Sequence, residues 1–226
     1  MKALAIDCAS RKMAVGAKNG DAFVTITLEG ASIQSKQLLP AIDFALKSVE
    51  LSPAELEFST LCAGPGTFTG LRIAFSALKA LTLSHGIPIF QVPTLFSYAK
   101  PFFSEAETVI SVIDAKKDQF FVSIYKNGTE IFPVSDTTPE KIVAFLKENA
   151  SAGKIFALGP SAPQFSQILN RIEPNFLVKV PKFLPPTTDA LLEIAAELKK
   201  NGESPLNDYD GPVYIRASEA ELSLAK

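Results

Sequence analysis

The chain has 226 residues, of which 47% are hydrophobic and 20% are charged, and it carries a formal net charge of −2. This length and composition are typical of a globular protein with one large domain or two small ones. The slightly acidic balance argues against a strongly basic nucleic-acid clamp, and two cysteines are too few for a disulfide framework. The apolar runs are shorter than the ~20 residues of a membrane helix, and the N-terminus reads as a strand rather than a signal peptide. We therefore expect a soluble, cytoplasmic protein.

The first half of the chain predicts three strands, a helix and a fourth strand. These elements are residues 2–6, 13–18, 22–28, 36–49 and 58–63. The first strand ends in Asp7, and Asn19-Gly20 between the second and third strands is a strong hairpin signal. The fourth strand runs into Gly64-Pro65.

The second half repeats this order about 107 residues later. Its strands and helix are residues 108–113, 119–126, 129–134 and 139–149. The first of these strands ends in Asp114, Asn127-Gly128 separates the next two, and a further strand again ends in Gly-Pro, at Gly159-Pro160. Five matching features in one order indicate two copies of one structural unit.

The repeated unit is a three-strand meander joined through helices to parallel strands, which is the ribonuclease-H-like α/β topology. Two tandem copies form the architecture of the actin, Hsp70 and sugar-kinase (ASKHA) superfamily. The alternative is an ordinary doubly wound sheet, but that fold seldom opens on a hairpin. We expect an N-terminal domain of residues 1–103 plus 213–226. The C-terminal domain would then be residues 104–212, including a helix at residues 189–200.

A glycine-rich loop, Gly64-Pro65-Gly66-Thr67-Phe68-Thr69-Gly70-Leu71-Arg72, follows the strand at residues 58–63. Its glycines and proline mark a sharp strand-to-helix turn, with Thr67 or Thr69 as helix cap and backbone N–H groups suited to an anion. The loop lacks the Gly-x4-Gly-Lys-Ser/Thr pattern of a phosphate-binding Walker A motif. We expect a structural loop formed by Gly64, Gly66, Thr67, Thr69, Gly70 and Arg72.

Asp7 and Asp114 stand where an actin-like enzyme holds nucleotide phosphate and magnesium. The first turn of that superfamily reads Asp-x-Gly-Thr/Ser, whereas here it is Asp7-Cys8-Ala9-Ser10, and the turn after Asp114 contains no glycine. The sequence therefore argues against ATP turnover. Two interpretations stay open. Asp7 and Asp114 are either structural turn residues that belong to the fold, or Asp7, Ser10 and Asp114 bind ATP or ADP weakly.

Catalysis by metal or by a nucleophile has little support in the sequence. His85 is the only histidine, so a His-x-x-x-His metal site is excluded, and its place near a helix end suits a helix-dipole partner. Cys8 and Cys62 follow apolar runs, which predicts buried, reduced thiols. We predict no catalytic residue and no metal site.

Two apolar helices suggest a surface for a partner. On residues 36–49 one face carries Leu38, Ile42, Ala45 and Val49, broadened by Leu39 and Leu46. On residues 71–83 only a narrow stripe of Arg72, Ser76 and Lys79 is polar. Such a helix needs cover on more than one side, either from the other helix or from another molecule.

The sequence resembles the TsaB family, also called YeaZ. The glycine-rich loop is the specific match, and weaker matches in the same order are Leu4-Ala5-Ile6-Asp7, Leu38-Leu39-Pro40-Ala41-Ile42, Pro93-Thr94-Leu95, Val112-Ile113-Asp114-Ala115-Lys116-Lys117 and Pro212-Val213-Tyr214-Ile215-Arg216. One departure is Gln34, where family members often have a histidine.

The resemblance implies a role in forming N6-threonylcarbamoyladenosine (t6A) at position 37 of tRNAs that read codons beginning with A. A TsaB protein is a non-catalytic subunit that needs no cofactor. It supports the catalytic paralogue TsaD, joins the ATPase TsaE in a ternary complex, meets tRNA only through that complex and forms a homodimer when alone. The resemblance assigns partner binding to Leu38, Leu39, Ile42, Leu71, Phe75 and Leu78. One alternative is an active actin-like ATPase or small-molecule kinase. Another is a peptidase, for which this chain lacks a set of metal ligands.

Overall fold

The computed structural model describes residues 1–30, 33–149 and 154–216. The chain folds into two compact units. Unit 1 consists of Met1–Ser97 and Pro186–Tyr214, and unit 2 of Tyr98–Pro185 together with the chain from Ile215 onward. No helix in the described ranges is long and apolar enough to cross a membrane.

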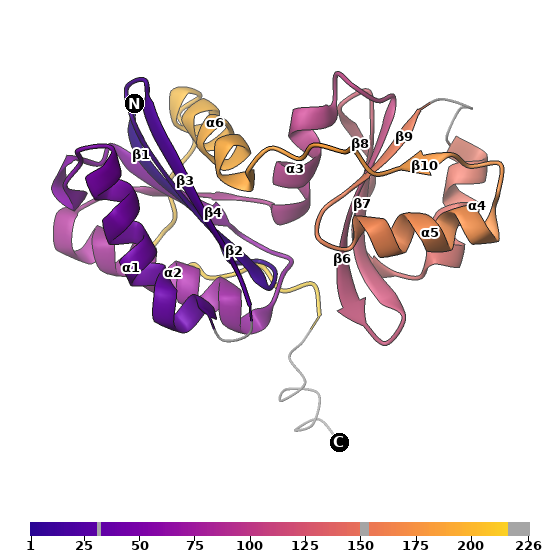
Figure 1. Cartoon of the computed structure of the whole chain (residues 1–226), viewed down its shortest axis with the longest axis horizontal. Helices are drawn as coiled ribbons and strands as arrows, with labels where there is room; N and C mark the ends of the chain where they lie inside the picture. The colour runs from indigo at the N-terminus through magenta and orange to yellow at the C-terminus, as the bar shows by residue number, and fades with distance from the viewer. Residues whose placement is uncertain (31–32, 150–153, 217–226) are drawn as a thin grey trace. The chain divides into compact units, whose positions relative to one another are not determined.

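Unit 1 is built on a five-stranded sheet in the order β3-β2-β1-β4-β5 (Figure 1). Its strands are β1 (Lys2–Asp7), β2 (Lys12–Asn19), β3 (Ala22–Glu29), β4 (Phe58–Cys62) and β5 (Ile89–Val92). The first three form an antiparallel meander, whereas β4 and β5 run parallel to β1. Gly20 has a φ of 59°, which permits the two-residue turn between β2 and β3.

Helices cover both faces of this sheet (Figure 1). The helices of unit 1 are α1 (Ile33–Ser48), α2 (Phe68–His85), the short α3 (Thr94–Ala99) at the unit boundary and α6 (Thr187–Lys200), with a 3-10 turn η1 (Pro53–Glu55). Helices α1 and α2 share a buried core with Leu4, Ile6 and Val15. Helix α6 packs against the opposite face, where Phe58 and Phe90 lie.

Unit 2 repeats the topology of unit 1, with strand order β10-β9-β6-β7-β8. Its elements are η2 (Lys100–Phe102), β6 (Thr108–Lys116), β7 (Gln119–Lys126), β8 (Thr129–Thr137), α4 (Pro139–Asn149), β9 (Ile155–Leu158), α5 (Ala162–Ile172) and β10 (Val178–Lys179). Strands β6 to β8 form the antiparallel meander, and β9 and β10 continue the sheet in parallel. The predicted repeat and the tandem ribonuclease-H-like fold are confirmed, and the doubly wound alternative is wrong because each unit opens with an antiparallel meander.

The division into units differs from the predicted domains at the C-terminal side. Helix α6, expected in the second domain, belongs to unit 1 because it closes the open apolar face of that sheet. The first turn of α6 packs closely against the sheet, because a Cβ on Gly16 of β2 would lie 2.7 Å from Thr188 Cβ. Val213 and Tyr214 also belong to unit 1, whereas Arg216 belongs to unit 2.

Candidate functional site

The glycine-rich loop lies directly against the turn that follows β1. The Thr67 N–H donates to the Ala9 carbonyl oxygen at 2.7 Å. A Cβ on Gly66 would lie 2.7 Å from that same oxygen, and one on Gly70 would overlap the Cys8 carbonyl oxygen. Glycine is therefore required at both positions because two backbone segments touch there.

Thr67 occupies the residue before α2, but its side chain does not cap the helix, contrary to one of the two expectations. The hydroxyl instead lies 3.3 Å from the Cys8 carbonyl oxygen, to which it donates. Gln34 of α1 donates to the Ser10 carbonyl oxygen from the other side of the turn. The turn that would hold phosphate in an actin-like enzyme is thus bonded to the chain's own α1 and α2 segments.

The Asp7 residue is 5% exposed, and both of its carboxylate oxygens accept hydrogen bonds within unit 1. Its Oδ1 accepts from the Ala9 N–H at 2.9 Å, and its Oδ2 accepts from the Thr187 hydroxyl at 2.8 Å. The Ser10 hydroxyl in turn bonds to both backbone groups of Lys12. Asp7 therefore shapes its own turn and holds the start of α6, a role that sequence reasoning missed because Thr187 is 180 residues away.

Replacing Thr187 with valine should lower the free energy of unfolding by about 2 kcal/mol, because a buried carboxylate oxygen loses its hydroxyl donor. Chemical denaturation measures this change. Thr187→Ser is the matched control, since it keeps the hydroxyl and should stay close to the wild type. A Thr187→Val variant as stable as the wild type would contradict a stabilising hydrogen bond between Thr187 and Asp7.

Both cysteines are buried and free, as predicted. Burial raises the pKa of the Cys62 thiol well above its ordinary value, and the neighbouring Asp7 carboxylate raises it further. Burial likewise raises the pKa of the Cys8 thiol. Both groups are therefore protonated thiols at neutral pH and poor nucleophiles.

Asp114 lies in unit 2 near the end of β6, where the pairing with β7 becomes irregular, rather than at the end of the strand as predicted. Burial would raise the pKa of its carboxyl group, but hydrogen bonds from the Lys116 ammonium and N–H outweigh this and lower it. Lys116, Lys117 and Asp118 all have left-handed φ angles, between 57° and 67°. Because such angles are unfavourable without glycine, this turn needs support from elsewhere.

Arg216 supplies that support within unit 2. Its guanidinium donates to the Ala115 carbonyl oxygen at 3.0 Å and to Asp136 Oδ2 at 2.7 Å, and it also reaches the Gln119 side chain. Beside the turn lies a pocket of about 570 Å³ whose lining includes Lys116 and Lys117. The arginine was visible in the sequence only as part of the family match at residues 212–216.

The predicted partner-binding residues are mostly in the core. Leu38, Ile42, Leu71, Phe75 and Leu78 are each no more than 6% exposed, because they fill the space between the sheet of unit 1 and its helices. These five side chains are unavailable to a partner in this conformation, which corrects the expectation that they face outward.

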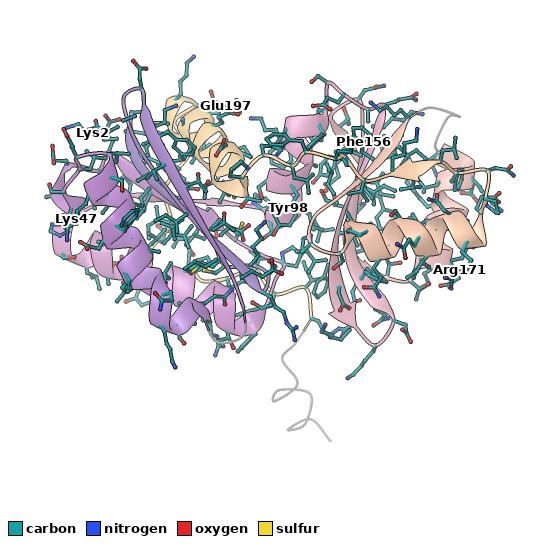
Figure 2. The ribbon with its side chains drawn as sticks, in the orientation of Figure 1. Lys2, Lys47, Tyr98, Phe156, Arg171 and Glu197 are labelled. Atoms are coloured by element: carbon teal, nitrogen blue, oxygen red, sulfur yellow. The ribbon has the colours of Figure 1, made fainter. Side chains whose placement is uncertain are left out.

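Leu39 is the predicted residue that does reach the surface, with 67% of its side chain exposed. It lines a groove of about 510 Å³ between α1 and η1, together with Asp43 and Lys47. Lys47 pairs with Asp43 at 2.7 Å on the outer side of α1 and points away from the sheet (Figure 2). Phe44 of α1 and Leu83 of α2 are also exposed, at 61% and 85%.

The polar stripe of α2 is covered by the chain returning to unit 1. The Lys79 ammonium donates to the carbonyl oxygens of Asp208 and Asp210. The Arg72 guanidinium lies 3.7 Å above the Phe68 ring and donates to the Tyr214 hydroxyl at 3.0 Å. Residues 206–214 therefore pack along this polar stripe, so the stripe is not a purely solvated face.

No group of three potential ligands close enough to hold a metal ion occurs among the described residues. The two repeated sheets, each opening with an antiparallel meander, define the tandem ribonuclease-H-like fold of the actin-like type. Solved structures show the same fold. A Bacteroides thetaiotaomicron VPI-5482 protein described as having an "actin-like ATPase fold and unknown function" matches with a TM-score of 0.50 and 10% identity, covering 85% of this chain and 95% of that one.

A Pseudomonas aeruginosa structure described as "an uncharacterized protein with similarity to peptidase YEAZ" matches more closely, with a TM-score of 0.78 and 21% identity over 95% of this chain and 99% of that one. The sequence model of the family described as "TsaD: tRNA N6-adenosine threonylcarbamoyltransferase" matches residues 31–197, more than half of the chain.

Curated relatives carry the description "tRNA threonylcarbamoyladenosine biosynthesis protein TsaB". The protein of Buchnera aphidicola subsp. Acyrthosiphon pisum (strain APS) is 30% identical, over 74% of this chain and 76% of its own length. That of Escherichia coli (strain K12) is 25% identical, over 97% and 96%. The chain belongs to the TsaB (YeaZ) family.

Proposed function

We propose that this chain is a non-catalytic subunit in the formation of t6A at position 37 of tRNAs reading codons that begin with A. It binds and supports a catalytic paralogue of the TsaD type in the cytoplasm. Membership of the TsaB family, with relatives aligned over nearly the whole chain, carries the proposal. The match of residues 31–197 to the TsaD family model also supports it, because it relates this chain to the proposed partner.

The environment of Asp7 supports a role without catalysis by this chain. Both carboxylate oxygens have partners within unit 1, and the turn after β1 is bonded to the glycine-rich loop and to Gln34. In an active phosphotransferase the corresponding groups would be directed at phosphate and magnesium. Helices α1 and α2 provide the proposed contact with the TsaD-type paralogue, a TsaE-type ATPase completes a ternary complex, and tRNA is met only through that complex.

The test is light scattering after gel filtration on this chain, on the TsaD-type protein of the same organism and on their mixture. We expect a stable heterodimer, and t6A formation on a cognate tRNA only when this chain and the TsaE-type ATPase accompany the TsaD-type protein. The proposal is wrong if the two proteins do not associate with or without nucleotide.

A second assay distinguishes the proposed function from the competing one, an actin-like ATPase or small-molecule kinase. Magnesium-dependent ATP hydrolysis by the isolated chain should be at background level. Hydrolysis that Asp7→Asn abolishes in a folded protein would favour the enzyme instead. The pocket beside Lys116 and Lys117 is the one place in the described part of unit 2 that we propose for weak ATP or ADP binding, and titration calorimetry with ADP tests it.

A further inference from the structure

Unit 2 has a pocket on the face of its sheet that lies opposite α4 and α5. These two helices share a core with Ile155 and Ala157 of β9. Because successive side chains of a strand point to opposite faces, Phe156, labelled in Figure 2, lies on the other face. There η2 and residues 181–185 contribute to a pocket of about 340 Å³ that Phe156 also lines.

Aromatic rings and prolines form most of the lining of this pocket. Phe102 and Phe156 are nearly buried, at 5% and 6% exposure, and their rings meet edge to face with centroids 6.0 Å apart. Phe183 lines the same pocket, yet it is 76% exposed. An exposed ring beside two buried ones gives a planar ligand a surface on which to stack. The remaining apolar residues of the lining are three prolines, Pro101, Pro181 and Pro185.

Lysines surround these aromatic side chains. Lys182 lines the pocket, and the Lys154 ammonium lies 4.3 Å from the centroid of the Phe156 ring. Lys179 is the register partner of Phe156 between β10 and β9, so its exposed side chain lies on the same face. Glu105 is the acidic residue of the lining. Three lysines against one carboxylate make this region positive, although the whole chain carries a net charge of −2.

We propose that a patch of unit 2, formed by Lys154, Phe156, Lys179, Lys182 and Phe183, binds an unpaired nucleotide of tRNA. The base stacks on the Phe183 ring, and the lysines hold the neighbouring phosphates. Every base has a face that stacks on an aromatic side chain, and every nucleotide brings a phosphate. A base within a duplex is already stacked between its neighbours, so the nucleotide comes from a loop or a single-stranded end.

The charges of the patch favour RNA over a protein partner. Lysine is depleted from the centres of protein interfaces, because burying an ammonium without a counter-charge is costly. The Lys154 ammonium donates to the Glu105 carbonyl oxygen at 3.1 Å, which is an uncharged acceptor. A phosphate would supply the missing negative charge. The inference rests on the proposed function, in which the complex brings tRNA to this chain, and the small patch then adds one contact.

The first test measures RNA binding by the isolated chain with fluorescence anisotropy at low salt, where phosphate contacts are strongest. The probes are a labelled single-stranded oligouridylate and an RNA duplex of the same length. We expect the single strand to bind more tightly. Phe183→Ala should raise its dissociation constant about fivefold or more, whereas Phe183→Tyr keeps the ring and should retain the wild-type value.

Because Phe183 is mostly exposed, both variants should fold, and a stability difference does not obscure the result. The proposal is overturned by an absence of binding, by equal binding of the duplex, or by a Phe183→Ala variant that binds as tightly as the wild type. Displacement of the RNA by UDP at an equal nucleotide concentration would assign the patch to a free nucleotide, which also overturns it.

The second test uses the salt dependence of the same binding. Lys182→Gln should lower the slope of log affinity against log salt concentration by about 0.7, the value for one lost phosphate contact on a single strand. Lys141→Gln is the matched control, because Lys141 is an exposed lysine of α4, which packs on the other face of the sheet. Equal changes in the two variants would assign the effect to net charge and contradict the patch.

The third test uses the complex with the TsaD-type protein. Phe183→Ala should raise the KM for tRNA in t6A formation about fivefold or more and leave kcat and the heterodimer unchanged, because a contact made equally in the ground and transition states affects KM alone. A heterodimer weakened by Phe183→Ala, with the affinity for RNA unchanged, would assign the patch to a protein partner and overturn the inference.

The results separate this inference from the proposed function. If the heterodimer forms and modifies tRNA with the same KM in the wild type and Phe183→Ala, the inference is wrong and the proposed function is retained. If no heterodimer forms but the isolated chain binds single-stranded RNA through Phe183, the proposed function is wrong and the RNA-binding patch is supported.

Discussion

Gly70→Ala is expected to destabilise unit 1 by about 3 kcal/mol or more, a large fraction of the stability of a typical domain. The new Cβ would overlap the Cys8 carbonyl oxygen and would also lie 2.5 Å from the Thr67 hydroxyl oxygen and 2.8 Å from Gln34 Oε1. The first of these is backbone at the end of β1, so it cannot move without displacing the turn that holds Asp7. Chemical denaturation of the purified variant measures the loss.

Gly211→Ala is the matched control for this prediction. The same substitution there meets no atom within 4 Å, and its φ lies outside the left-handed range. We expect a change within about 0.5 kcal/mol, because the site has no feature that the methyl group disturbs. A Gly70→Ala variant as stable as Gly211→Ala would contradict the close approach of the two segments.

The loss in Gly70→Ala should extend to function even where the protein still folds. The glycine-rich loop starts α2, and its Thr67 N–H bonds to the turn after β1. Moving the loop therefore shifts the start of one of the two helices proposed to contact the TsaD-type protein. Weaker heterodimer formation by folded Gly70→Ala, measured by gel filtration, is the expected consequence.

The repeated sheets could be predicted because their signals are local. Asn19-Gly20 and Asn127-Gly128 each close a hairpin, Asp7 ends the first strand of one meander, and Asp114 lies two residues before the end of the first strand of the other. Alternation and turn chemistry act within a few residues. Their recurrence in the same order therefore predicted the antiparallel meander of each sheet and a further strand beside it, whereas β5 and β10 were not predicted.

The position of α6 could not be predicted, since periodicity shows which side of a helix is apolar but not which sheet it covers. Its contacts depend on Thr187 meeting Asp7 and on Thr188 fitting against Gly16, far apart in sequence. The same limit applies to Arg72 and Lys79, whose partners Tyr214 and Asp208 lie more than 120 residues further along the chain. Pairings over such separations leave no periodic trace in a single sequence.

The apolar surplus of α2 predicts cover from either the neighbouring helix or another molecule, and the structure shows cover by the neighbouring helix. Both α1 and the sheet of unit 1 cover α2, so Phe75 and Leu78 need no external partner. A helix between a sheet and a neighbouring helix has the same composition as one at an interface. Exposure, rather than apolar character, separates Leu39 from the other five predicted residues.

Leu78→Asp should prevent unit 1 from folding stably. Leu78 is 0% exposed and belongs to the core shared by α1, α2 and the sheet. An unpaired carboxylate in such a site costs at least about 4 kcal/mol beyond the lost packing. Loss of the cooperative thermal transition in circular dichroism is the expected observation, and a folded variant of wild-type stability would place Leu78 outside the core.

Leu39→Asp makes the same chemical change on the exposed side of α1, so it separates partner binding from folding. With 67% of Leu39 exposed, the variant should fold with a stability within about 0.5 kcal/mol of the wild type. If α1 contacts the TsaD-type protein, a carboxylate buried at that contact should weaken the heterodimer about tenfold or more. Leu177→Asp, at a leucine of unit 2 that is 70% exposed and lies outside α1 and α2, adds the same charge as a control. A heterodimer equally strong in wild type and Leu39→Asp would exclude this part of α1 from the contact, and equal weakening by Leu177→Asp would assign the effect to net charge instead.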